Sequence, residues 1–195
     1  MKAVLDEVGR RLLDADESTI RIPEICEATG VNYGSVYHHF GSREGVIDTA
    51  YNMLFLQFAE DDLDALRQVS ETANSLDEYI AGLSTLVGRF SSGPDRQRRR
   101  AMRIRIAAAS LTRPDLRRVI GETQTRLTTE LMRIVRYGQD RGWLRRDVTT
   151  RSIAVMLQAL LVGRVIDDIS TEPINSAEWE LSMAILFISL LNQEK

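Results

Sequence analysis

Apolar residues recur along most of the chain at three- and four-residue spacing, which is the period of an amphipathic α-helix. Val4, Val8 and Leu12 form one such stripe near the start. Polar or Gly/Pro-containing breaks at 70–75 and 91–94 interrupt the pattern. The periodicity predicts about nine helices, at residues 2–14, 23–29, 33–40, 43–66, 76–90, 95–111, 115–141, 149–169 and 176–191. The expected fold class is therefore all-α.

The last two predicted helices differ from the others because they are apolar on nearly every side. Residues 153–166 contain only Gln158 and Arg164 as strongly polar side chains, and residues 183–191 contain only Ser189. A helix that is apolar all round must be buried all round. At the end of a small domain a partner subunit meets this need most easily, so we expect a homodimer through these helices, with two helices from each chain.

Composition narrows the class of protein. The chain has 195 residues, of which 44% are hydrophobic, enough for one or two packed domains. A single cysteine, Cys26, excludes a disulfide framework and a zinc site built on cysteines. The sequence shows no signal peptide and no apolar run of about 18–20 residues, so we expect a cytoplasmic protein that does not bind a membrane.

Residues 20–44 carry the most specific signal in the chain. Pro23 suits the first turn of a helix, and Gly30 suits the residue that ends it. Asn32 can cap a second short helix, at 33–40, through its side-chain oxygen. Two short helices joined by a glycine-containing turn are typical of a helix-turn-helix, whose second helix enters the major groove of DNA.

The same residues carry a family resemblance. Ile25, Gly30 and Val31, followed by Gly-Ser-Val-Tyr-His-His-Phe at 34–40 and Ser-Arg-Glu at 42–44, closely resemble the DNA-binding domain of the tetracycline-repressor (TetR) family of bacterial transcription regulators. The motif covers about a quarter of the chain, and the resemblance of the remainder rests on length and helix pattern.

The resemblance implies a helix-turn-helix DNA-binding domain of three helices at 1–48 and a helical effector-binding and dimerisation domain at 49–195. It implies a homodimeric regulator, expected to be a repressor that a small-molecule effector releases from double-stranded operator DNA. Ligand binding would shift the fourth helix and change the separation of the two recognition helices, which must match major grooves about 34–36 Å apart. The alternative is an all-α scaffold or small-molecule-binding protein without sequence-specific DNA binding.

The resemblance also indicates which side chains would meet DNA. The expected DNA-binding residues are Arg21, Asn32, Tyr33, Gly34, Ser35, Tyr37, His38 and Arg43. Ser35 and Tyr37 match family positions that contact phosphate, which positions the protein without specifying sequence. Tyr33 stands where relatives often carry a small polar or basic residue, so it is expected to influence the operator sequence. Asn32 can serve as a helix cap as well, and Tyr37 can alternatively be a half-buried packing residue.

Charge is distributed unevenly. Residues 1–50 hold 5 Lys plus Arg against 9 Asp plus Glu, a net of −4, which is unusual where phosphates must bind. Residues 95–146 hold 15 Arg against 5 Asp plus Glu, a net of +10. The favoured interpretation of the arginine run at 96–105 is a solvated helix face. Three other interpretations remain. The arginines could pair with acids such as Asp61, Asp62 and Asp64, form an anion site for an effector, or bind nucleic acid directly.

The predicted effector site lies among the helices of the second domain. Its expected residues are Leu86, Phe90, Met102, Arg103, Ile106, Gln124, Met132, Met156 and Gln158. Methionines suit an adaptable apolar cavity, and the polar members would orient a ligand. Arg103 is the candidate partner for a carboxylate or phosphate, so the effector is expected to be anionic or lipophilic.

Catalytic and metal-binding patterns are missing from the sequence. It contains no P-loop, G-x-G-x-x-G, G-x-S-x-G or zincin motif. The two histidines, His38 and His39, are neighbours on one helix and do not face each other. We therefore expect no enzymatic activity, no cofactor and no metal.

Overall fold

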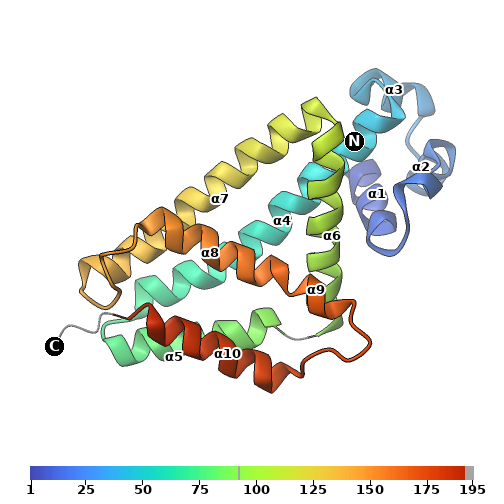
Figure 1. Ribbon diagram of the computed structural model, residues 1–195. Coiled ribbons are helices and arrows are strands. Elements are labelled where there is room, and N and C mark those ends of the chain that lie inside the picture. Colours follow the sequence, from blue (N-terminus) through green and yellow to red (C-terminus); the bar gives the residue numbers. More distant parts are fainter. Residues whose placement is uncertain (92, 192–195) are drawn as a thin grey trace. The chain divides into compact units, whose positions relative to one another are not determined.

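The computed structural model describes residues 1–91 and 93–191, and it confirms the all-α class (Figure 1). Its elements are α1 (Lys2–Asp14), the 3-10 turn η1 (Glu17–Thr19), α2 (Ile22–Thr29), α3 (Tyr33–Phe40), α4 (Arg43–Thr72), α5 (Leu76–Ser91), α6 (Pro94–Thr112), α7 (Pro114–Asp140), α8 (Thr150–Gly163), α9 (Val165–Asp168) and α10 (Ser176–Ser189). Each of the nine predicted helices has a counterpart within the described residues, and the four-residue α9 lies in the last part of the one predicted at 149–169.

Two helices differ in extent from the prediction. α4 continues to Thr72, through the polar stretch that was expected to end it near Leu66, and the hydroxyls of Ser70 and Thr72 there donate to the carbonyls of Arg67 and Gln68. The predicted helix at 149–169 is divided in two, into α8 and α9. The sequence pattern predicted neither the longer α4 nor the division of the helix at 149–169.

The chain packs as two compact units. Unit 1 comprises Met1–Phe58 together with Arg105–Glu122, and unit 2 comprises Ala59–Ile104 together with the chain from Thr123 onward. The long helices α4, α6 and α7 therefore contribute residues to both. The functional boundary between residues 48 and 49 stays a prediction, whereas the packing assigns a segment from much later in the chain to the helix-turn-helix unit.

Unit 1 is built on the stripe that the sequence predicts. Val4, Val8 and Leu12 of α1 are fully buried, and α1 packs against α2. Ile25 of α2 and Val36 of α3 are fully buried as well. Buried apolar side chains of α2 and α3 therefore hold these two helices against the core of unit 1.

Unit 2 has a separate apolar core. The buried residues of its main cluster are Ala73, Tyr79, Val135, Leu144, Ile153 and Leu190. Figure 1 shows α10 lying alongside α5, the pair of helices that closes one side of this unit. Among the described residues, no helix is both long enough and apolar enough to cross a lipid bilayer.

Candidate DNA interface and effector pocket

The turn between α2 and α3 forms as its sequence predicts. Pro23 lies in the first turn of α2, and Gly30 ends that helix with φ at 68°, a left-handed conformation that glycine adopts without strain. The side-chain oxygen of Asn32 accepts a 2.8 Å hydrogen bond from the backbone N–H of Gly34 and caps α3. The Asn32 cap thus sets the first residue of α3.

The outer face of α3 presents a compact polar and aromatic surface. Tyr33, Gly34, Ser35 and His38 are exposed, whereas Val36 on the opposite face is fully buried. The rings of Tyr33 and Tyr37 lie 4.6 Å apart between centroids. Hydrogen bonding with Tyr33, and then burial, raises the pKa of Tyr37. Its phenolic O–H is a group that can donate to an anion.

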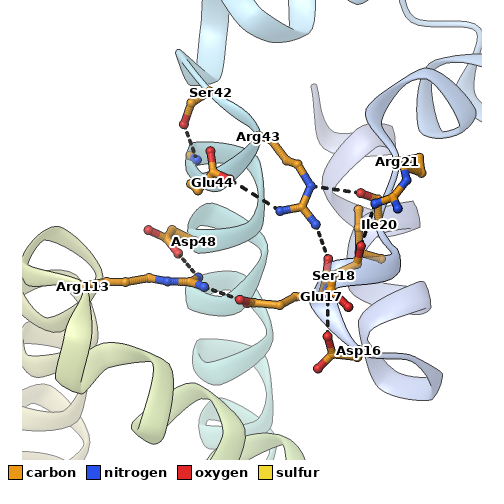
Figure 2. Close-up of polar contacts among 11 residues, drawn as sticks. Asp16, Glu17, Ser18, Ile20, Arg21, Ser42, Arg43, Glu44, Asp48 and Arg113 are labelled. Atoms are coloured by element: carbon orange, nitrogen blue, oxygen red, sulfur yellow. Dashed lines mark hydrogen bonds and ion pairs between the residues drawn. The ribbon is translucent and has the colours of Figure 1, made fainter.

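The two arginines expected at DNA have different surroundings. Arg21 is exposed, and its guanidinium donates to the carbonyl of Ser18 at 2.6 Å. Arg43 is half-buried and donates to the carbonyls of Glu17 and Ile20, the latter at 3.0 Å. Figure 2 shows Arg43 reaching from the start of α4 to the η1 turn. Arg43 therefore has a structural role within unit 1 that the sequence did not indicate.

The acidic side chains near the start of the chain are largely engaged within unit 1. Arg10 and Arg11 both pair with Glu7, and their hydrogen bonds lower the pKa of Glu7 to about 2. Asp16 accepts from the backbone N–H of Ser18 at 2.9 Å and caps η1. These contacts engage the acids within unit 1 but leave the net charge of −4 unchanged, because that sum already counts Arg10 and Arg11.

The arginines of α6 are mostly paired within unit 2. Asp62 accepts from both Arg96 and Arg103, the latter at 2.7 Å, and Arg99 pairs with Asp61 at 2.7 Å. Their side chains are 15–22% exposed, so the favoured interpretation as a solvated face is wrong for these three residues. Pairing with acids of α4 is confirmed for Asp61 and Asp62, whereas Asp64 pairs with Arg67.

One arginine of this helix is more deeply buried than the rest. Arg100 makes a two-pronged pair with Asp168 of α9, at 2.7 and 2.8 Å, and the two side chains are 8% and 11% exposed. Arg164 lies close by and is also buried. Burial lowers the pKa of Arg164, and the charge of Arg100 lowers it further. Periodicity could not reveal this pair, because 68 positions separate its members.

A small pocket opens among these ion pairs in unit 2. Its lining consists of Asp62, Arg96, Arg99, Arg100, Arg103 and Leu161. Arg103 is therefore the one predicted effector residue in the lining of this pocket. Leu161 had not been expected there.

The other predicted effector residues are not in the lining of this pocket, and they differ in burial. Gln124 and Gln158 do meet, through a side-chain hydrogen bond that Thr128 joins at 3.2 Å from Gln158. Leu86 and Met102 are buried, Met132 is half-buried, and Met156 is exposed. Ile106 is fully buried and belongs to unit 1, although it follows Met102 by one turn of α6. The side chain of Phe90 lies outside the described residues.

Metal chemistry finds no support in this arrangement. Within residues 1–91 and 93–191, no group of three or more His, Cys, Asp or Glu side chains is placed to hold a metal ion. His38 and His39 are both exposed, and the ring of His39 meets that of Phe40 edge-on.

Comparison with sequence families gives two matches along the chain. Residues 19–50 match the family described as bacterial regulatory proteins, tetR family. Residues 80–169 match the C-terminal domain of BetI-type transcriptional repressors. The HTH-type transcriptional regulator UidR of Escherichia coli K12 is 24% identical over 148 residues, which cover 76% of this chain and 70% of UidR.

Solved structures agree on the fold. A transcriptional regulator from Saccharomonospora viridis in complex with choline superposes with a TM-score of 0.72 at 19% identity, covering 98% of this chain and 97% of that one. Salmonella enterica GusR superposes with a TM-score of 0.71 at 21% identity, covering 97% and 94%. At these identities the likeness concerns the all-α architecture.

Proposed function

We propose, from the premise that this chain belongs to the tetracycline-repressor family of DNA-binding transcription regulators, that it represses its target genes as a homodimer until a small anion binds unit 2. Regulators of this family bind operator DNA and small-molecule effectors, are typically dimers, and are not enzymes. The operator contacts, the dimer interface and the class of effector are proposals for this chain. Because the family is bacterial and acts on operator DNA, we place its action in the cytoplasm.

The exposed face of α3 is the observation that carries the DNA-binding proposal. It combines a capped N-terminus, which favours anions, with Ser35, Tyr37 and His38 as donors to phosphate. Tyr33, 49% exposed, is the side chain proposed to reach base edges or sugars. Gly34 lets the backbone approach DNA, and Arg21 and Arg43 add positive charge beside the helix.

Selection of binding sequences from random duplex DNA, followed by gel shift with the selected operator, tests this function. Tyr37→Phe removes one donor and is expected to weaken binding to all duplexes by roughly five-fold, about 1 kcal/mol. Tyr33→Phe keeps the ring contact with Tyr37, so any change in preference among operator variants reports the Tyr33 hydroxyl. Thr29→Ser, on α2, serves as the control that should bind like wild type.

The outcomes distinguish the alternatives. Selection that yields no preferred sequence would favour the scaffold or small-molecule-binding protein over a regulator. A preferred sequence that both tyrosine variants bind as wild type does would show that α3 is not the reading helix.

The dimer proposal rests on exposed apolar side chains of α8 and α10. Leu181, Ile185 and Ile188 of α10 are 56–64% exposed and follow helical spacing, and Val155 of α8 is also exposed. Large apolar side chains gathered on two neighbouring elements mark an interaction site. The occupant that fits is a second copy of the same helices, because a two-fold interface uses the same patch on both subunits.

The effector proposal rests on the pocket that Asp62 shares with four arginines. Asp62 already occupies part of the site as an internal carboxylate, bridging Arg96 and Arg103. An effector carboxylate or phosphate can take its place and form the same charge-assisted hydrogen bonds. The released Asp62 lies on α4, whose first residues continue directly from the recognition segment. Arg99 and Arg100 pair with carboxylates of their own, Asp61 and Asp168, so an effector that replaces Asp62 would pair with Arg96 and Arg103.

Thermal unfolding with a panel of carboxylates, phosphates and neutral lipophilic compounds tests the effector class. We expect anions alone to raise the melting temperature of wild type, in proportion to RT ln(1 + [L]/Kd). Asp62→Asn is expected to strengthen that response, because the internal competitor loses its charge, and Arg103→Ala to weaken it. Arg98→Ala, an exposed arginine of the same helix, is the matched control. Stabilisation by neutral compounds alone, or equal anion responses in all four proteins, would exclude the pocket as an anion site.

A further inference from the structure

Arg113 lies between α6 and α7, far along the chain from the helix-turn-helix, yet its side chain contacts both segments that flank that motif. Its guanidinium donates to the carboxylate of Asp48 on α4 at 2.9 Å and to the carboxylate of Glu17 in η1 (Figure 2). Glu17 precedes α2, and Asp48 lies in the second turn of α4, after α3. One side chain thus ties the segment before the helix-turn-helix to the segment after it.

Glu17 is held from two directions. Its carboxylate accepts from Arg113, while its backbone carbonyl accepts from Arg43, which also binds the carbonyl of Ile20. Figure 2 shows Arg43 and Arg113 approaching Glu17 from different sides. Arg43 belongs to the motif itself, but Arg113 comes from a segment that joins unit 1 only through tertiary packing.

The surroundings of these ion pairs strengthen them. Arg113, Glu17 and Asp48 are each about one-quarter exposed, so solvent screens their attraction less than it screens a surface pair. Burial tends to lower the pKa of Arg113, but its bonds to Glu17 and Asp48 outweigh that effect and raise it. The buried Tyr51 hydroxyl also lies beside Glu17: burial, and then Glu17, raises its pKa.

The backbone at Arg113 makes it a firm anchor. Pro114 follows it and restricts its conformation to the extended region, and the carbonyl of Arg113 accepts the first hydrogen bond of α7 from Arg117 at 2.9 Å. A second arginine of the same segment, Arg105, donates to the carbonyls of Leu12 and Ala15 at the end of α1, at 2.6 and 2.8 Å. Residues 105–122 thus hold the end of α1, η1 and the start of α4.

From this geometry we infer that Arg113 is a positioning residue for operator binding, which acts through Glu17 and Asp48 to fix the frame that presents α3. The inference rests on the proposed function, since it assumes that α3 reads DNA. It extends the DNA-binding unit beyond the motif, to an arginine that does not touch DNA.

The test compares operator affinity and its salt dependence for wild type, Arg113→Ala and Arg117→Ala. Arg117 is an exposed arginine four positions further along the same segment, so its removal changes charge equally. Arg113→Ala is expected to weaken operator binding about three- to ten-fold, the size expected for two partly exposed ion pairs. The slope of log Kd against log salt should stay unchanged, because no phosphate contact is lost. Arg117→Ala should bind like wild type.

Glu17→Gln supplies a readout that a general loss of stability would not reproduce. It removes the charge that Arg113 binds and leaves the backbone carbonyl for Arg43. If both residues act through one contact, the double variant with Arg113→Ala should bind no more weakly than the weaker single variant. Arg113→Lys, which keeps one ion pair, should be intermediate. Amide hydrogen exchange at residues 17–20 and 43–48 should accelerate in Arg113→Ala, with no change in α8 and α10.

Three results would overturn the inference. Wild-type affinity in Arg113→Ala excludes a positioning role, and a salt slope reduced by about 1 indicates direct phosphate contact instead. Additive effects of Glu17→Gln and Arg113→Ala exclude the route through Glu17. If Arg113→Ala does not fold, Arg113→Lys and Glu17→Gln decide the question in its place. If wild type selects no operator, the proposed function fails separately. In that case, unchanged hydrogen exchange at residues 17–20 and 43–48 in Arg113→Ala would show that Arg113 does not fix these two segments.

Discussion

Ile185→Asp is expected to abolish the homodimer and, with it, high-affinity operator binding. Ile185 is 60% exposed in the single chain, so a charge there leaves the fold of one chain intact. In the proposed interface the same carboxylate would be buried without a partner, twice because of the two-fold symmetry, at a cost of roughly 3–5 kcal/mol each. Sedimentation at micromolar concentration should show a monomer, and gel shift should show at least ten-fold weaker binding to a two-half-site operator.

Leu111→Asp is the matched control for this substitution. Leu111 is 72% exposed and lies on α6, outside the α8 and α10 face, so its variant should remain dimeric. Leu157 would be a poor probe, because it packs partly against the core of unit 2 and a charge there would test folding instead. A dimeric Ile185→Asp protein, or a wild type that sediments as a stable monomer, would contradict the proposed interface.

Asp168→Ala is expected to destabilise unit 2 strongly. It removes the carboxylate that pairs with Arg100 in a setting where both side chains are about nine-tenths buried. It also removes a negative charge that offsets the positive charges of Arg100 and Arg164. Burial, and then the charge of Arg100, already lowers the pKa of Arg164. Removing one member of a buried pair costs about 3–5 kcal/mol, because the other charge remains buried. Urea unfolding followed by circular dichroism measures the loss.

Asp64→Ala provides the comparison for an exposed pair. Asp64 pairs with Arg67 at 2.8 Å on the surface of α4, where such a pair contributes about 0.5 kcal/mol or less. The loss in free energy of unfolding, relative to wild type, should therefore be several-fold larger for Asp168→Ala than for Asp64→Ala. Equal, small losses would show that water reaches the Arg100–Asp168 pair and screens it.

The recognition segment was predictable because its signals are local. The Asn32 cap, the left-handed Gly30 and the buried Val36 depend on neighbours within a few positions, and each forms as the sequence predicts. The apolar stripes of α1 and α10 are local in the same sense. Residues 183–191 were predicted to be apolar on nearly every side and to need a partner subunit for burial, and Ile185, Leu186 and Ile188 of α10 are exposed in the single chain.

The partners of the arginines were not predictable, because charge is long-ranged and a helical sequence does not specify which acid it meets. The sequence of residues 96–105 was consistent both with a solvated face and with an ion-pair network. In the structure Arg96 and Arg103 are largely buried and pair with Asp62. Arg43 was expected at phosphate, and its bonds to two backbone carbonyls appear only when η1 folds against α4.

The sequence by itself determined the all-α class, the helix-turn-helix and the face of α3 that is proposed to meet DNA, because helical period, caps and turn glycines act over one to four residues. Tertiary structure alone decided that residues 105–122 belong to the unit of the helix-turn-helix, that Arg113 joins Glu17 to Asp48, and that Asp62 sits among the arginines of its pocket. Those contacts span more than thirty positions of chain. Their formation depends on how whole helices pack, which no local pattern records.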